Sequence, residues 1–141
     1  MLVRLLYASR TQEPITAEEA GDIVRDSREY NPAHGITGML CYSDRMFMQL
    51  LEGGRRQVNS LYARILADPR HHDVILLDYE EITERRFADW TMGRVDLDKQ
   101  NPSLLLKYSA TARLDPYSMS GKVVLELLEE LIHSAVAVPS P

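Results

Sequence analysis

The sequence has a single cysteine, Cys41, among its 141 residues. One thiol cannot form a disulfide within the chain, so nothing in the sequence requires an oxidising compartment. Apolar runs stay well short of the roughly 20 residues of a membrane-spanning helix, and the amino-terminal segment lacks the apolar core of a signal peptide. We therefore expect a cytoplasmic protein without a membrane partner.

Positive charge is also scarce, since 16 lysine and arginine residues stand against 21 aspartate and glutamate residues, for a net charge of −5. Proteins that bind nucleic acid gather Lys and Arg on one surface, so we expect no nucleic-acid partner. The four histidines lack the spacing of metal ligands, and there is no CxxC pattern; His71 and His72, adjacent in a predicted loop, are expected to be solvated. The sequence therefore predicts no metal site. A nucleophile elbow and a phosphate-binding loop are missing as well, so it predicts no common hydrolase site either.

What the sequence does have, over its first 97 residues, is an alternation of strand and helix patterns. The first predicted helix begins at a capping box of Thr16 and Glu19 and ends near Tyr30, because Asn31 precedes Pro32. The other predicted elements are strands over 2–9, 72–82 and 91–97, a hairpin over 35–53 and a helix over 55–68. This β-α-β-β-α-β-β order predicts an α+β, ferredoxin-like sandwich with both helices on one sheet face.

Residues 98–141 predict a helical extension to a domain that spans residues 1–97. Its two helices are expected over about residues 102–112 and 119–136, and the second is strongly amphipathic. We favour packing of both helices on the open face of the chain's own sheet. The same apolar stripe would also suit a partner chain, so a homodimer stays open.

Gln49 is a polar residue in the middle of the apolar segment FMQLLEG. A buried, unpaired amide costs about 1–3 kcal/mol, and in the predicted sheet the first and third strands are neighbours, so we expect Gln49 to bond Tyr7. Both would then lie at the bottom of a slot between the two helices, a typical site for a flat ligand. The floor is Tyr7, Gln49 and Phe47, the walls are Ile23, Val24 and Ile65, and the rim is Asn31, Arg64 and Asp68.

The residues alone leave other interpretations open. Arg64 and Asp68 are four positions apart, a spacing that also suits an ordinary surface ion pair. The same fold serves as an interaction module without a cofactor. It also serves small enzymes of the acylphosphatase kind, although the first loop, SRTQEPIT, has no glycine-rich cradle for an anion.

The sequence resembles the BLUF family, the blue-light sensors that use FAD. The resemblance covers roughly residues 1–97 and rests on LLYAS, NPAHGITGMLCYSDRMFMQLLEG, VNSLYARILADPRHH and FADWTMG, which occur in the family's order and at its intervals. It implies a blue-light photoreceptor without enzymatic activity that binds FAD non-covalently, with FMN or riboflavin as alternatives. A covalent adduct with Cys41 is not expected, because this cysteine lies outside the sequence context of such sensors.

The resemblance also implies roles for individual residues. Tyr7 matches the redox-active tyrosine, which transfers an electron and a proton to the excited flavin, and Gln49 matches the glutamine whose rearrangement gives a red-shifted signalling state. Trp90 and Met92 match the residues that complete this switch, and they would relay it to residues 98–141 and to a downstream regulatory protein or self-association. The expected flavin contacts are Tyr7, Ile23, Tyr30, Asn31, Phe47, Gln49, Arg64, Ile65 and Asp68.

Overall fold

The computed structural model describes residues 1–89 and 92–131, so Trp90 and the end of the helix expected over 119–136 lie outside the described residues. The order of its strands and helices is the predicted one up to residue 97. The elements are β1 Leu2–Arg10, α1 Ala17–His34, β2 Thr37–Ser43, β3 Met46–Gly54, α2 Arg55–Ala67, β4 His72–Ile82, β5 Gly93–Asp96, η1 Leu97–Lys99, α3 Pro102–Tyr108, η2 Pro116–Ser118 and α4 Gly121–Leu131.

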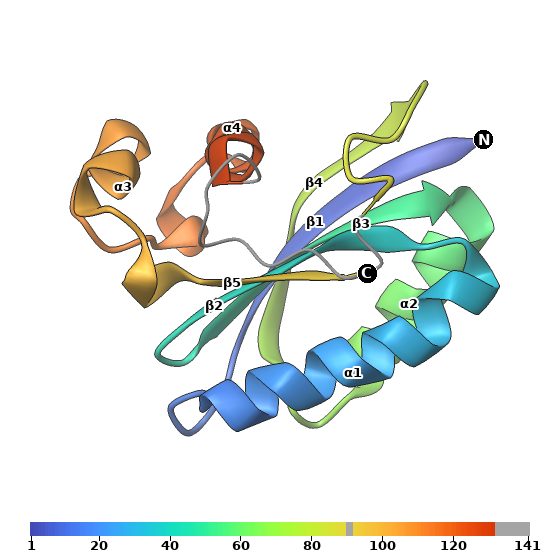
Figure 1. Ribbon diagram of the computed structural model, residues 1–141, viewed down its shortest axis with the longest axis horizontal. Helices are drawn as coiled ribbons and strands as arrows, with labels where there is room; N and C mark the ends of the chain where they lie inside the picture. The colour runs from blue at the N-terminus through green and yellow to red at the C-terminus, as the bar shows by residue number, and fades with distance from the viewer. Residues whose placement is uncertain (90–91, 132–141) are drawn as a thin grey trace.

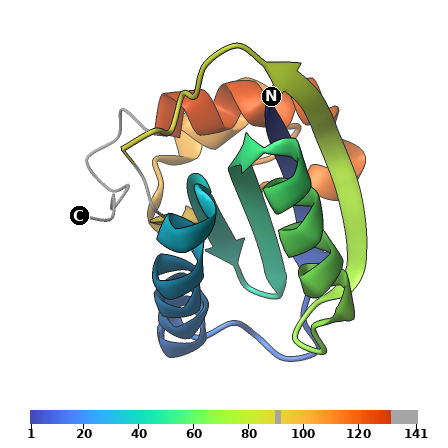
Figure 2. The same cartoon turned by 90° about the vertical axis from the view of Figure 1, so that its right-hand side faces the viewer.

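The sheet lies between two layers of helices (Figures 1 and 2). Its strand order is β4-β1-β3-β2-β5, and all neighbours are antiparallel except β2 and β5. Helices α1 and α2 cover one face, and α3 and α4 lie on the other (Figure 1). The α+β, ferredoxin-like fold is thus confirmed, with β1 and β3 side by side in the middle of the sheet.

Helix α1 is longer than the sequence predicted. It begins at Thr16, whose hydroxyl accepts a hydrogen bond from the Glu19 N–H at 3.0 Å, but it continues through Pro32 to His34. The end near Tyr30 was therefore wrong. Proline weakens a helix chiefly by removing one intrahelical bond; here it does so in an exposed last turn, and Gly35, with φ of 67°, ends the helix in the left-handed conformation.

The carboxy-terminal helices cover the open face of the chain's own sheet, as favoured from the sequence. Val124, Leu127 and Leu128 of α4 are buried in the same cluster as Leu6, Met48 and Leu50 from the central strands. Helix α3 ends at Tyr108 rather than near residue 112, because Ser109 already closes its last turn by donating to the Leu105 carbonyl. Within the described residues, no helix combines the length and apolarity that a bilayer crossing needs.

Close contact between α4 and β4 fixes where α4 begins. A Cβ atom on Gly121 would lie 2.1 Å from the Leu77 carbonyl oxygen, so only glycine fits at this crossing. Directly after Gly121, the Lys122 ammonium lies 3.1 Å from an Asp78 oxygen and 3.3 Å from a Glu80 oxygen. The extension is therefore held to the sheet by apolar packing and by ion pairs along β4.

Candidate functional site

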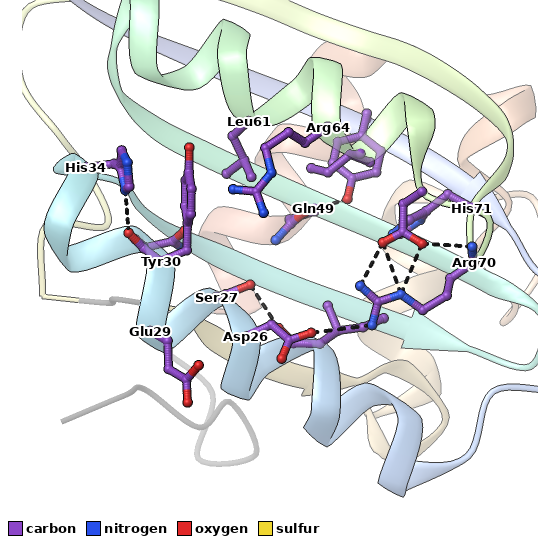
Figure 3. Close-up of a pocket in the computed structure, with 15 residues that line it drawn as sticks. Asp26, Ser27, Glu29, Tyr30, His34, Gln49, Leu61, Arg64, Arg70 and His71 are labelled. Atoms are coloured by element: carbon purple, nitrogen blue, oxygen red, sulfur yellow. Dashed lines mark hydrogen bonds and ion pairs between the residues drawn. The ribbon is translucent and has the colours of Figure 1, made fainter.

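A cavity of about 560 Å³ opens between α1 and α2 above the sheet (Figure 3). Strands β1 and β3 supply its floor, the two helices supply its walls, and the loop between α2 and β4 closes one end. The lining residues are Tyr7, Ile23, Asp26, Ser27, Glu29, Tyr30, Asn31, His34, Gln49, Leu61, Arg64, Ile65, Asp68, Arg70 and His71. This volume is typical of a small-molecule site.

Tyr7 and Gln49 meet on the floor of this cavity. The two residues are directly opposite in the register of β1 and β3, and the Tyr7 hydroxyl donates a hydrogen bond to Gln49 Oε1. Both side chains are buried, with exposed fractions of 1% and 4%. Burial raises the pKa of the Tyr7 phenol far above its usual value, so the side chain is neutral and keeps its proton.

The other end of the Gln49 amide faces the segment before β5. Its Nε2 donates to the sulfur of buried Met92 at 3.5 Å. Gln49 therefore connects Tyr7 on β1 to Met92 beside β5. Trp90, which was expected to share this place with Met92, lies outside the described residues.

The residues that line the walls and the inner end of the cavity differ in part from those predicted for the slot. Ile23 and Ile65 line the cavity as expected, together with Leu61, and the buried Asn31 of the last turn of α1 reaches it. Val24 packs instead in the core beneath α1. Phe47 does not line this cavity but a smaller pocket next to it, because it pairs with Ser9, toward the β2–β3 turn from Gln49.

Three stacked side chains stand at the mouth of the cavity. The Arg64 guanidinium lies 4.4 Å from the centre of the Tyr30 ring, and the His34 ring stacks on Tyr30 with centroids 3.9 Å apart. Figure 3 shows Arg64 reaching from α2 toward Tyr30 and His34 on α1. The Arg64 side chain thus bridges the two helices across the opening by cation–π stacking.

Asp68 takes a different partner from the one that its spacing suggested. The alternative interpretation, an ion pair with Arg64, is wrong, because Asp68 follows the end of α2 and bonds Arg70 in the next turn, at 2.7 Å. The bond to Arg70 lowers the pKa of the Asp68 carboxyl, so this group stays charged. Arg70 also lies 3.5 Å from Asp26 of α1.

His71 is the main residue of the cavity that the sequence did not predict. We expected a solvated loop histidine, but His71 is buried and its Nδ1 lies 2.6 Å from the Ser9 hydroxyl. Its ring stands edge-on to Tyr7, with centroids 6.1 Å apart, and 5.5 Å from Phe47. Burial lowers the pKa of His71. The one available signal was Ser9, a polar residue that follows Tyr7 on the same strand face.

Two other expectations concern chemistry outside this cavity. Cys41 is buried, and it belongs to the cluster on the opposite face of the sheet, away from Tyr7 and Gln49. In the described part of the chain, no three His, Cys, Asp or Glu side chains gather as a metal site would require. The cavity therefore offers an apolar slot with a phenol and an amide on its floor, which suits a flat, heteroatom-rich ring.

Comparisons with known proteins agree with this chemistry. A family model described as "Sensors of blue-light using FAD", BLUF, matches residues 2–93. The photoactivated adenylate cyclase subunit beta of Euglena longa is 36% identical over 92 residues, which make up 64% of this chain and 11% of that protein. The chain thus spans only a small part of that curated relative.

Two solved structures are similar over nearly their whole length. The structure titled "BlsA photo-activated state" has a TM-score of 0.85 at 29% identity, and the match covers 96% of this chain and 98% of that one. "BlrB - a BLUF protein, dark state structure" has a TM-score of 0.77 at 35% identity, over 93% and 94% of the two chains. The chain belongs to the BLUF family of flavin-based blue-light sensors.

Proposed function

We propose that the cavity between α1 and α2 holds FAD non-covalently, and that Tyr7 and Gln49 turn the absorption of blue light into a change of hydrogen bonding. The observation that carries this proposal is the buried hydrogen bond between the Tyr7 hydroxyl and Gln49 Oε1 on the cavity floor. Within a sensor family, a phenol and an amide in contact beneath a flat slot are suited to switching.

The residues present fit a flavin. Ile23 and Ile65 on opposite walls would pack against the faces of an isoalloxazine ring, and Asn31 would bond its polar edge. Arg64 and Tyr30 lie toward the mouth, where the ribityl and phosphate groups would leave the cavity, whereas Asp68 pairs with Arg70 at the end that the α2–β4 loop closes. Phe47 would contact His71 and would not contact the isoalloxazine ring directly. FMN and riboflavin carry the same ring, so the site would accept them too.

Tyr7 is the side chain suited to start the switch. A bound flavin supplies the absorption of blue light and an excited state that accepts electrons. Tyr7 lies at the cavity floor and remains a neutral phenol because burial raises its pKa. It would therefore give up an electron together with the proton that it now donates to Gln49, and both would return afterwards, so that Tyr7 is restored.

Gln49 is suited to store the event because its amide has two ends of similar size, one a donor and one an acceptor. In the present orientation, Oε1 accepts from Tyr7 and Nε2 donates to the Met92 sulfur. After rotation, Nε2 would donate to Tyr7, whose hydroxyl can also accept, while Oε1 would face the sulfur. Since sulfur is a weak acceptor, the present orientation is favoured by little, and both arrangements are accessible.

The output would pass through residues 98–141 to a downstream regulatory protein, or change self-association. Support comes from α4, which packs on the sheet face opposite the cavity and contacts residues from the same central strands. The named relative is a photoactivated cyclase, so a BLUF segment can serve a larger regulatory protein. The partner and the cytoplasmic location are part of this proposal.

Flavin binding is tested on protein purified in the dark. One sample is heated to release any bound flavin, which is then identified. The flavin-free protein is then titrated with FAD, FMN and riboflavin. We expect a bound flavin and saturable binding of all three, which weakens in an Ile65→Asp variant that places a charge in the apolar wall. Stable protein that binds none of the three flavins would favour the cofactor-free interaction module instead.

A further inference from the structure

The carboxy-terminal extension touches the sheet at a second place, next to the closed end of the cavity. There, Tyr117 of the short helix η2 lies against Arg10 of β1 and Asp73 of β4. The Tyr117 hydroxyl donates to the Asp73 carbonyl at 2.8 Å, and the Arg10 guanidinium lies 3.9 Å from the centre of the Tyr117 ring. Arg10 also lies 3.7 Å from an Asp73 carboxylate oxygen. We call these three residues the edge latch.

Both strands that form the edge latch come directly from the cavity. On β1, Arg10 follows Ser9, and Ser9 bonds His71; on β4, Asp73 is two residues after His71. His71 lines the cavity and stands edge-on to Tyr7. A displacement of His71 would therefore reach the edge latch through two short paths, one along each strand.

At Asp73 the backbone departs from regular strand pairing, so the contact with the extension is easily disturbed there. The register of β1 and β4 passes from Arg10–His72 to Ala8–Ile75, so that Asp73 and Val74 together lie opposite Ser9. Asp73 has a φ of 48°, in the left-handed region. Such an extra residue interrupts the ladder of hydrogen bonds, and its carbonyl here is bonded by a side chain of the extension.

We propose that the edge latch is a switchable contact, through which the state of the flavin cavity controls whether the segment of residues 109–120 is held against the sheet. This inference depends on the proposed function, because it takes flavin as the occupant of the cavity. Arg10 and Asp73 have exposed side chains, at 51% and 53%. Exposed pairs of this kind contribute little, so a small shift of His71 is enough to open the contact.

Coupling of this kind must act in both directions. If the flavin-bound cavity favours the closed edge latch in the dark, then breaking the latch by mutation must weaken the binding of flavin in the dark, because linked equilibria are reciprocal. Burial raises the pKa of the Tyr117 phenol to about 12, so the hydroxyl remains a donor at neutral pH. The hydrogen bond from Tyr117 to Asp73 is therefore the part of the latch that can be removed most cleanly.

The test uses Tyr117→Phe, which removes the hydroxyl but keeps the ring beneath Arg10, and Arg10→Gln, which removes the cation. Tyr108→Phe is the matched control, because the Tyr108 hydroxyl bonds Glu130 within the extension and does not take part in the edge latch. Hydrogen exchange of residues 109–120 is measured in the dark and under blue light on full-length, flavin-loaded protein. The dissociation constant for FMN is measured in the dark.

In the wild-type protein, we expect exchange in residues 109–120 to rise under light. In Tyr117→Phe, exchange in the dark should already equal the lit wild-type rate, and FMN binding should weaken by up to about fivefold, the equivalent of one hydrogen bond. Arg10→Gln should act in the same direction, whereas Tyr108→Phe should keep the wild-type response to light and the wild-type affinity.

The outcomes separate this inference from the function on which it depends. If wild-type protein binds no flavin or has no spectral response to light, the proposed function fails and the edge latch fails with it. If the spectral response is normal but exchange in residues 109–120 does not change with light, only the edge latch is refuted. The same holds if Tyr117→Phe behaves like Tyr108→Phe in exchange and in FMN affinity.

Discussion

Replacing Glu52 by alanine should destabilise the protein strongly, although Glu52 lies outside the cavity. Its side chain is fully buried on the α4 side of the sheet. The carboxylate pairs with Arg4 at 2.8 Å, and it accepts hydrogen bonds from the backbone N–H groups of Arg86 at 3.0 Å and Phe87 at 2.8 Å. It thus neutralises a buried cation and holds the loop that leads to Met92.

The magnitude follows from what the substitution leaves behind. Breaking a buried ion pair by removing one partner costs about 3–5 kcal/mol, and within the described residues Arg4 would keep only Glu80, at 2.7 Å, as an ion-pair partner. Because domains are stable by about 5–15 kcal/mol, Glu52→Ala should lose a large share of the free energy of unfolding. Glu52→Gln, which keeps an acceptor for the two N–H groups but no charge, should lose less.

The assay is urea unfolding of the flavin-free protein, followed by circular dichroism. Glu81→Ala is the control, since Glu81 is exposed and pairs with Arg55 at the surface, where such pairs contribute about 0–1 kcal/mol. A loss for Glu52→Ala as small as that for Glu81→Ala would refute the reasoning, because the buried network would then not hold the loop.

Three further predictions follow from the site and the extension. Burial lowers the pKa of His71, so the unfolded chain binds more protons than the folded chain as the pH falls through about 6.5. The free energy of unfolding, measured with urea, should therefore drop between pH 7 and pH 5.5, and it should drop less in His71→Gln. Gly121→Ala should lower the thermal midpoint by several degrees, because its Cβ would lie 2.1 Å from the Leu77 oxygen, whereas Glu126→Ala, at an exposed position of the same helix, should not. Arg64→Ala should weaken the binding of FMN and FAD by about 10- to 150-fold, because a hydrogen bond to a charged group contributes about 1.5–3 kcal/mol, and riboflavin binding less; equal loss for all three flavins would contradict a contact between Arg64 and phosphate.

Much of the fold was predictable because local pattern and topology agree. Period-two alternation located the strands, and the β-α-β-β-α-β-β order placed β1 beside β3. That adjacency, together with the cost of burying an amide alone, was enough to predict the bond from Tyr7 to Gln49. The pairing of both strands along their length sets the register that places Tyr7 directly opposite Gln49.

The parts that were wrong depend on loops and helix ends. Asp68 was assigned to the rim of the slot, with an ion pair to Arg64 as the alternative, on the assumption that α2 continues through residue 68; α2 ends before Asp68, and the next turn brings Arg70 to it. His71 was assigned to solvent because neighbouring His72 and Asp73 are polar. Its burial results from the irregular pairing of β4 with β1, and no local sequence pattern reports such a shift.

The measurement that tests the central claim most directly is the light-minus-dark absorption spectrum of the flavin-loaded protein, compared with Tyr7→Phe and Gln49→Leu. The account predicts a small red shift in the wild-type protein that reverses in the dark, and no such shift in either variant, although both still bind flavin. A persistent red shift in Gln49→Leu would contradict the account, because the signal would then arise without the amide that is proposed to store it.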